Sequence, residues 1–242
     1  MTRLWPVRLQ RMLALDLQPE QQLDAMELAV VNPMLFRHLS SLHCPEFERQ
    51  VLIQGRSGSG RTALLKALCG SFSQRGLAVA FFDCAHYHQN QMIEVLDQPM
   101  QVDLLCLDNF DWVMSSSELQ QSIINYWQRR YRDQSGSGLV ITHSDALPAL
   151  RIKQDLISRL KAGTSYLLTP LSDQLRIQAL HRYAGERQEL LSDAAEKYIL
   201  NRHSRSLGQC IKLLDQAIVL AQAYKRPITV PIIKEVEGWS LG

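Results

Sequence analysis

The sequence lacks a strong charge of either sign, because 26 Lys and Arg residues nearly balance 24 Asp and Glu residues. A formal net charge of +2 does not indicate direct nucleic-acid binding, which needs a clustered basic surface. Long apolar runs are also missing, so no segment approaches the roughly 20 residues of a membrane span. Asp16 interrupts the N-terminal apolar stretch too early for a secretory leader. We therefore expect a cytoplasmic protein without a membrane partner.

Cysteine is scarce and follows no pairing or ligand pattern. The five residues are Cys44, Cys69, Cys84, Cys106 and Cys210. They are odd in number, widely spaced and free of any C-x-x-C pair, which argues against a disulfide framework and against a zinc site. We expect buried thiols in a reducing compartment.

Internal repeats are absent, and the first residues, to about Pro45, are expected to be irregular, punctuated by Pro6, Pro19, Pro33 and Pro45. Strand-like segments then alternate with helix-like ones. Short apolar segments predict strands at residues 50–55, 77–83, 102–108, 138–144 and 164–169. Helical spacing of apolar residues predicts helices at 61–76 and 117–133. Apolar strands separated by helices indicate a mostly parallel sheet that is covered on both faces.

After Pro170 the pattern becomes helical. Helices are predicted at residues 171–187, 191–203, 206–225 and 231–238, with Ser172 and Ser192 as N-caps of the first two. The sequence thus predicts an α/β core with a five-stranded parallel sheet, followed by a small all-helical domain. The predicted division is an N-terminal arm at 1–26, the α/β domain at 27–170 and the helical domain at 171–242.

The string GRSGSGRT follows the first predicted strand and opens the next helix. Its glycines let backbone N–H groups turn toward a phosphate, and the helix N-terminus adds partial positive charge. Arg61 stands where this motif normally has lysine and supplies a planar cation instead of a compact one. The alternative is a glycine-rich turn without a ligand. The candidate nucleotide-binding residues are Gly55, Ser57, Gly58, Ser59, Gly60, Arg61 and Thr62, and Thr62 is also placed for Mg²⁺.

Polar residues end two of the later strands. Asp108 closes LLCLD and suits an acid that holds Mg²⁺, directly or through water, although a strand-end acid without a ligand is the alternative. The next residue is Asn109, which cannot take a proton from water, and Asp111 is a poor geometric substitute. In VITHSD, the residues Thr142, Ser144 and Asp145 are candidate phosphate sensors, and the sequence does not choose among them.

These motifs, in this order, resemble the AAA+ ATPases and, within them, the DnaA family of replication initiators. The resemblance runs from about Glu27 to the end and includes LLCLDN, DLISRL, LTPLSDQLRIQAL and ITVPIIKEV. Arg61, Asn109 and the stop at Gly242, before any helix-turn-helix segment, are similar to a shortened branch of the family that works with the sliding clamp.

The resemblance implies a nucleotide-binding regulator rather than an enzyme with independent catalytic activity. It implies bound ADP, or ATP in its place, with Mg²⁺ held through Thr62 and Asp108. Arg159 resembles the arginine finger, acting in trans, and Arg205 the lid sensor that contacts nucleotide. The implied partners are DnaA and the sliding clamp (the beta subunit of DNA polymerase III), with DNA contacted only through the clamp and a homo-oligomer allowed. The implied function is stimulation of DnaA's ATP hydrolysis, which prevents re-initiation.

The clamp contact departs from the family pattern, a short peptide of the form Gln-Leu-x-Leu-x-Leu. MLALDL keeps Leu13, Leu15 and Leu17, but Met12 replaces the glutamine. A rival is QLDAM at residues 22–26, which has the glutamine and a weaker apolar end. The remaining alternative is an arm that only packs on the sheet.

Two other function classes stay open from the sequence. An autonomous AAA+ ATPase of the helicase-loader type would share the loop and the lid, but Asn109 argues against strong intrinsic hydrolysis. A small-molecule kinase would share the phosphate loop, but a helical lid with two placed arginines fits AAA+ better. An isolated arginine at either position, 159 or 205, is more often a surface charge.

Overall fold

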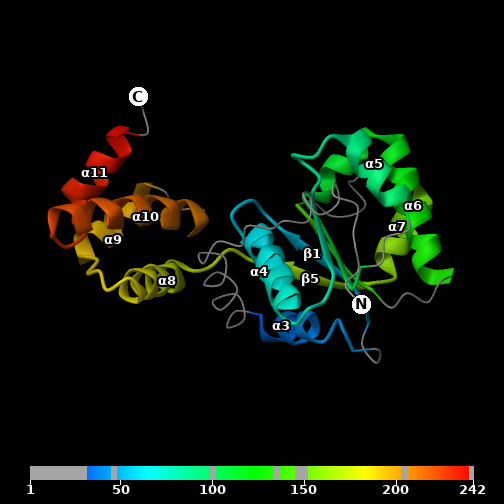
Figure 1. Ribbon diagram of the computed structural model, residues 1–242, viewed down its shortest axis with the longest axis horizontal. Helices are drawn as coiled ribbons and strands as arrows, with labels where there is room; N and C mark the ends of the chain where they lie inside the picture. The colour runs from blue at the N-terminus through cyan, green and yellow to red at the C-terminus, as the bar shows by residue number, and fades with distance from the viewer. Residues whose placement is uncertain are drawn as a thin grey trace.

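The computed structural model describes residues 32–44, 48–98, 102–132, 137–144, 152–202 and 207–239. Its centre is a parallel sheet of five strands in the order β2-β3-β4-β1-β5 (Figure 1). The strands are β1 Gln50–Gly55, β2 Val79–Asp83, β3 Leu104–Asp108, β4 Gly138–His143 and β5 Thr164–Leu168. All four strand pairings are parallel, so the carboxyl ends of the strands share one edge of the sheet.

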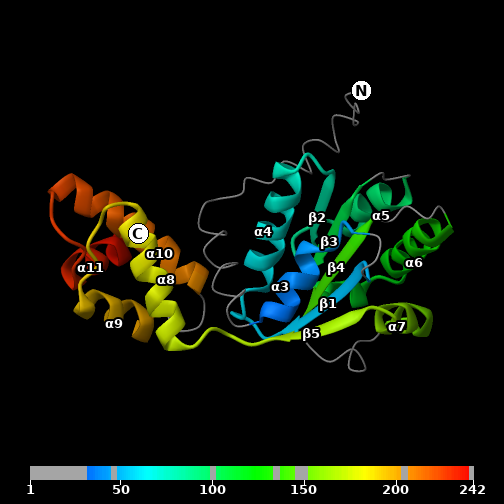
Figure 2. The same ribbon diagram turned by 90° about the horizontal axis from the view of Figure 1, so that it is seen from below.

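Helices cover both faces of the sheet (Figure 2). On one face lie α3 (Pro33–Ser40) and α4 (Arg61–Gln74), and on the other lie α5 (Gln89–Asp97), α6 (Ser117–Arg132) and α7 (Gln154–Lys161). A short 3-10 helix, η1 (Phe110–Ser115), follows β3 directly. Burial from both sides explains why β1 to β4 read as mostly apolar runs in the sequence, whereas the edge strand β5 is only partly buried.

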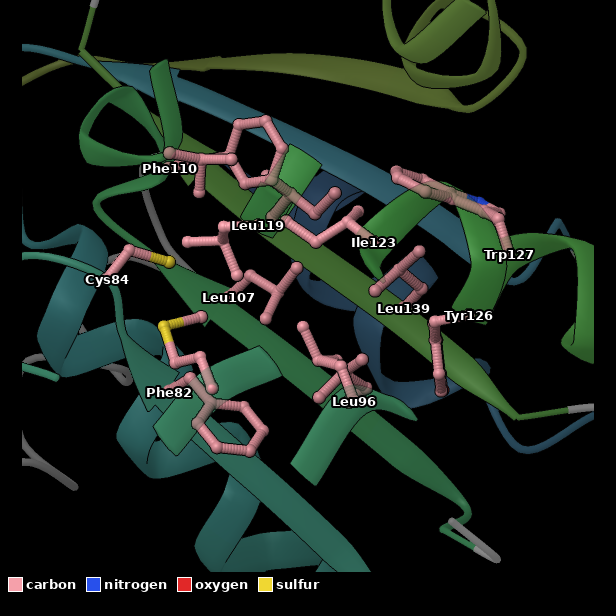
Figure 3. Close-up of a cluster of buried hydrophobic side chains, with 14 of the residues drawn as sticks. Phe82, Cys84, Leu96, Leu107, Phe110, Leu119, Ile123, Tyr126, Trp127 and Leu139 are labelled. Atoms are coloured by element: carbon pink, nitrogen blue, oxygen red, sulfur yellow. The ribbon is translucent and has the colours of Figure 1, made fainter. Parts of the chain in front are cut away.

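The larger core of the α/β part lies between the sheet and helices α5, α6 and α7. Leu107 and Leu139 project from the strands toward Ile123 and Trp127 of α6 (Figure 3). A second cluster on the opposite face joins α3 and α4 to the alternate side chains of the same strands. The sheet is therefore anchored on both faces, and its polar carboxyl edge is held in place.

Four helices follow the sheet: α8 Asp173–Glu186, α9 Asp193–Arg202, α10 Leu207–Tyr224 and α11 Val230–Trp239. They form a cluster beyond the carboxyl end of β5 (Figures 1 and 2) with a hydrophobic core of its own. Ser172 caps α8 by accepting from the Leu175 amide at 3.3 Å, as its position predicted. Leu171 packs against this core and also against the α3–α4 side of the sheet, so it connects the two parts.

The predicted fold class is confirmed, and the strand predictions differ from the structure only by one or two residues at some ends. The expectation of an irregular segment through Pro45 was wrong at α3. Pro33 is compatible with the first turn of a helix, and the Asn32 side chain caps it by accepting from the Leu35 amide at 3.2 Å. The domain boundaries at 26 and 170 stay predictions. Within the described ranges, every helix is too short or too polar to cross a membrane.

Candidate nucleotide-binding site

The loop between β1 and α4 has the backbone of a phosphate cradle. Gly58 and Gly60 have φ values of 81° and 88°, a region that side-chain-bearing residues rarely adopt. Gly60 is the N-cap of α4 and offers no side-chain cap, and the first turn of the helix contains no acidic residue. The first N–H groups of α4 therefore point out of the helix without an internal partner, as an anion site requires.

Gly55 allows the loop to pass close to β5. A Cβ at this position would lie 2.4 Å from the Ser59 Oγ atom and 2.8 Å from the Leu168 carbonyl oxygen. The second contact is with backbone and cannot be relieved by a rotamer change. The loop thus folds tightly against the end of the sheet because residue 55 has no side chain.

Replacing Gly55 with alanine is expected to lower the free energy of unfolding by about 1–3 kcal/mol, the usual cost of overpacking. The measurement is urea denaturation followed by circular dichroism. Gly185→Ala is the matched control, because a Cβ there meets nothing within 4 Å. It lies near the end of α8, where alanine is expected to be neutral or stabilising. Equal stability of Gly55→Ala and the original protein would contradict the tight packing of the loop.

Two buried polar atoms of the loop have no hydrogen-bond partner among the residues that the structure describes. They are the Ser59 hydroxyl and the Nη1 atom of Arg61. A buried donor that makes no hydrogen bond costs free energy, so such atoms in a native site call for a ligand or water. Both lie at the opening of α4, where a phosphate would supply the missing acceptors. The loop residues therefore fit the diphosphate group of a bound nucleotide.

Asp108 lies at the centre of the polar edge and is completely buried. Its Oδ2 atom accepts a hydrogen bond of 2.6 Å from the Thr62 hydroxyl, and its Oδ1 atom accepts one from the Thr142 hydroxyl. The structure thus brings together three predicted residues from α4, β3 and β4. A threonine hydroxyl beside a buried carboxylate is a suitable place for Mg²⁺ carried by the nucleotide.

The strand-end candidates after Thr142 have different surroundings. The backbone N–H of Ser144 donates to both oxygens of the Asp111 carboxylate, at 3.1 and 2.8 Å. The Asp111 carboxylate therefore holds the end of β4. Among the sensor candidates, Thr142 is the residue that contacts the Asp108 site. Asp145 lies outside the described residues.

The position after Asp108 is part of the same network. Asn109 donates its backbone N–H to the Thr142 hydroxyl at 3.0 Å and its side-chain Nδ2 to Asp83 Oδ1 at 2.9 Å. Asp83 ends β2, the strand beside β3, and the sequence reasoning missed it. The signal was available only in part: Asp83 ends a predicted strand, but its pairing with β3 is a property of the fold.

Arg159 lies far from this loop. Its backbone oxygen accepts a hydrogen bond of 2.6 Å from Gln50 Nε2, at the amino end of β1, whereas the loop begins at the carboxyl end. Five residue steps of about 3.3 Å separate these ends by about 17 Å. The Arg159 side chain is 28% exposed and pairs with Asp155 through Nε at 3.2 Å. Among the described residues none bonds to its two terminal nitrogens.

Gln50 is a second residue that sequence reasoning missed. It is buried, receives a 2.8 Å hydrogen bond from Trp127 Nε1 and donates to the carbonyl oxygens of Arg159 and Leu160. This contact fixes the end of α7 against the sheet. The remaining candidates, Arg205, Leu13, Leu15 and Leu17, lie outside the described residues.

Comparison with known proteins gives one match to a protein family. Residues 173–236 match the family described as "Hda, lid domain". This range covers α8 to α10 and most of α11, the helical cluster that follows the sheet.

Solved structures of similar fold include replication initiators and a DNA motor. Domain III of the Thermotoga maritima replication initiation protein DnaA aligns with a TM-score of 0.72 at 16% identity, over 90% of this chain and 96% of that one. AMPPCP-bound DnaA from Aquifex aeolicus aligns with a TM-score of 0.63 at 18% identity, over 86% and 66%. The Thermotoga maritima RuvB branch migration motor aligns with a TM-score of 0.61 at 15% identity, over 86% and 67%.

At these identities the structural likeness establishes the fold alone. The chain has the fold of a DnaA-type AAA+ domain, and its lid matches that of Hda. The fold implied by the resemblance is thereby confirmed, and the family match of the lid agrees with the resemblance.

Proposed function

We propose that this chain, with its DnaA-type fold and Hda-type lid, is a regulator of chromosomal replication initiation that acts on another AAA+ molecule. In this proposal it holds ADP, or ATP, with Mg²⁺, docks on the DNA-loaded sliding clamp and stimulates ATP hydrolysis by DnaA. The result is that DnaA is returned to its ADP form and re-initiation is prevented.

The observation that supports this proposal best is the separation of Arg159 from the chain's own loop. The two ends of β1 are about 17 Å apart, and Arg159 is fixed at the end distant from the loop by Gln50. Among the described residues nothing bonds to its terminal nitrogens, and in this proposal they reach a second molecule. An arginine that reaches a neighbouring nucleotide can stabilise the charge of phosphoryl transfer.

The nucleotide of the chain itself has a different part in this proposal. The loop, Thr62 and Asp108 fit a bound diphosphate and its Mg²⁺, and Asn109 offers no proton acceptor beside them. Bound ADP would stabilise the conformation that presents Arg159, while the bond that breaks belongs to the partner's ATP. Arg205 is proposed as the lid contact to the same nucleotide.

Reconstitution tests the proposal. ATP-loaded DnaA, clamp loaded on DNA and this protein are mixed, and conversion of bound ATP to ADP is followed over time. We expect fast conversion only when all three are present. Conversion at an equal rate without the clamp would show that the stimulation does not require the clamp. No acceleration in the full mixture would contradict the proposed function.

Changing Leu13, Leu15 and Leu17 together to alanine is expected to weaken clamp binding by at least about 100-fold, because each leucine loses an apolar contact of about 1 kcal/mol or more. The measurement is surface plasmon resonance on immobilised clamp. The matched variant changes Leu23 and Met26 in the rival peptide to alanine. If that variant loses clamp binding and the triple variant retains it, the docking segment is QLDAM.

A further inference from the structure

The side-chain amide of Asn109 lies between two carboxylates. Its Nδ2 atom donates to Asp83 Oδ1 at 2.9 Å and, more weakly, to Asp108 Oδ2 at 3.4 Å. A carboxylate can only accept, so the NH₂ group must face both acids and the amide oxygen must face away from them. The orientation of the amide is therefore determined by its neighbours.

Asp83 is itself held in place. Its Oδ1 atom also accepts from the Ala85 N–H at 3.1 Å, and its Oδ2 atom contacts His86 Nδ1 at 2.7 Å. The register of the sheet pairs Asp83 of β2 directly with Asp108 of β3. The strand pairing and the three donors fix the carboxylate next to the position that follows Asp108.

The surroundings already carry substantial negative charge. Burial, together with the carboxylates of Asp108 and Asp83, raises the pKa of the neighbouring Cys84 thiol. A third carboxylate at position 109 would face two others at hydrogen-bonding distance, and like charges so close together are destabilising. The backbone of residue 109 has a φ of 53°, which asparagine and aspartate tolerate better than most residues.

We propose that Asp83 is a positioning residue. Its carboxylate, on β2, stands in for a carboxylate at position 109, the position that follows Asp108. Asp83 fixes the Asn109 side chain by accepting a hydrogen bond from the NH₂ group of the amide. The carboxylate of the Asp83–Asn109 pair thus lies on β2, and position 109 carries an amide, which is not a proton acceptor. The chain therefore retains its nucleotide instead of hydrolysing it. This inference rests on the proposed nucleotide binding, but the Asp83–Asn109 pairing can be tested without nucleotide.

The first test is thermal unfolding of the full chain without nucleotide or partner. Asn109→Asp is expected to lower Tm by at least about 2–4 °C, the shift produced by the loss of about one hydrogen bond in a protein of this size. Adding Asp83→Asn is expected to restore Tm, because the amide and the carboxylate exchange places. Asp103→Asn is the control for net charge: it removes a carboxylate from the amino end of β3 and should restore nothing.

The second test is steady-state ATP hydrolysis by the same variants. In the exchanged pair, a carboxylate at position 109 can take the proton of the attacking water. The oxygen of that water bonds to the γ-phosphorus while the bond from the γ-phosphorus to the β–γ bridging oxygen breaks, giving ADP and phosphate. We expect kcat to rise at least about 10-fold over the original protein in Asp83→Asn/Asn109→Asp, with KM for ATP within about threefold. Asn109→Asp alone should remain well below the double variant.

The outcomes separate this inference from the proposed function. Failure of Asp83→Asn to rescue the Tm of Asn109→Asp, or equal rescue by Asp103→Asn, would overturn the pairing. Equal kcat in the single and double variants, or no rise in the double variant, would overturn the role of Asp83 in retaining ATP. None of these readings involves DnaA, the clamp or Arg159, so a failed reconstitution leaves them unchanged.

Discussion

Replacing Arg159 with alanine is expected to reduce the stimulated ATP hydrolysis of DnaA by about 10³-fold or more, since an arginine supplied in trans contributes roughly 10³–10⁵ to related phosphoryl transfers. The side chain is partly exposed and, within the described ranges, pairs with Asp155, while the backbone oxygen of Arg159 accepts from Gln50. Its removal should leave the fold, ADP binding and clamp binding unchanged. The measurement is single-turnover hydrolysis in the full mixture.

Lys161→Ala supplies the matched control for this prediction. Lys161 is exposed on the same helix, α7, and carries the same charge as Arg159. A general electrostatic attraction to DnaA would weaken similarly in both variants. If Arg159→Ala stimulates DnaA as well as the original protein while it binds ADP and the clamp normally, Arg159 is not the finger.

The second large effect is expected at Arg61. Its Nη1 atom is buried at the start of α4 with no partner in the described part of the chain, and a diphosphate would provide the acceptor. Hydrogen bonds to charged groups contribute about 1.5–3 kcal/mol, so Arg61→Ala should weaken ADP binding by about 10- to 100-fold. Isothermal titration calorimetry measures this directly.

Arg61→Lys separates charge from shape in the same experiment. Lysine is the usual residue at this position of the loop motif, but its compact ammonium does not reproduce the planar fork. We expect Arg61→Lys to retain most of the ADP affinity. An Arg61→Ala variant that binds ADP as tightly as the original protein would exclude a phosphate contact for Arg61.

The fold could be predicted from the sequence because its strongest signals are local. Strands β1 to β4 are short, mostly apolar runs that are buried on both faces, and the glycine string between β1 and α4 marks the site. The sequence does not predict helix α3 because Pro33 reads as punctuation, although proline is compatible with the first turn of a helix. The shorter helices α5 and α7 present too few turns for a clear periodic pattern.

The site was predictable residue by residue but not as a network. Thr62, Asp108 and Thr142 were each recognised at the end or start of an element, and the fold joins them. Asp83 and Gln50 were missed because their roles depend on contacts with Asn109 and Arg159, which are 26 and 109 residues away along the chain. Such contacts follow from strand order and register, which local patterns do not contain.

In the proposed function, the ATP that is hydrolysed belongs to the partner and not to this chain. The direct test uses γ-phosphate label in one protein at a time. With labelled ATP bound to DnaA, the account predicts rapid phosphate release that depends on the clamp and on Arg159. With labelled ATP bound to this chain and unlabelled ATP on DnaA, it predicts release no faster than from the chain alone. Rapid release in the second arrangement, with none in the first, would contradict the account and favour an autonomous ATPase.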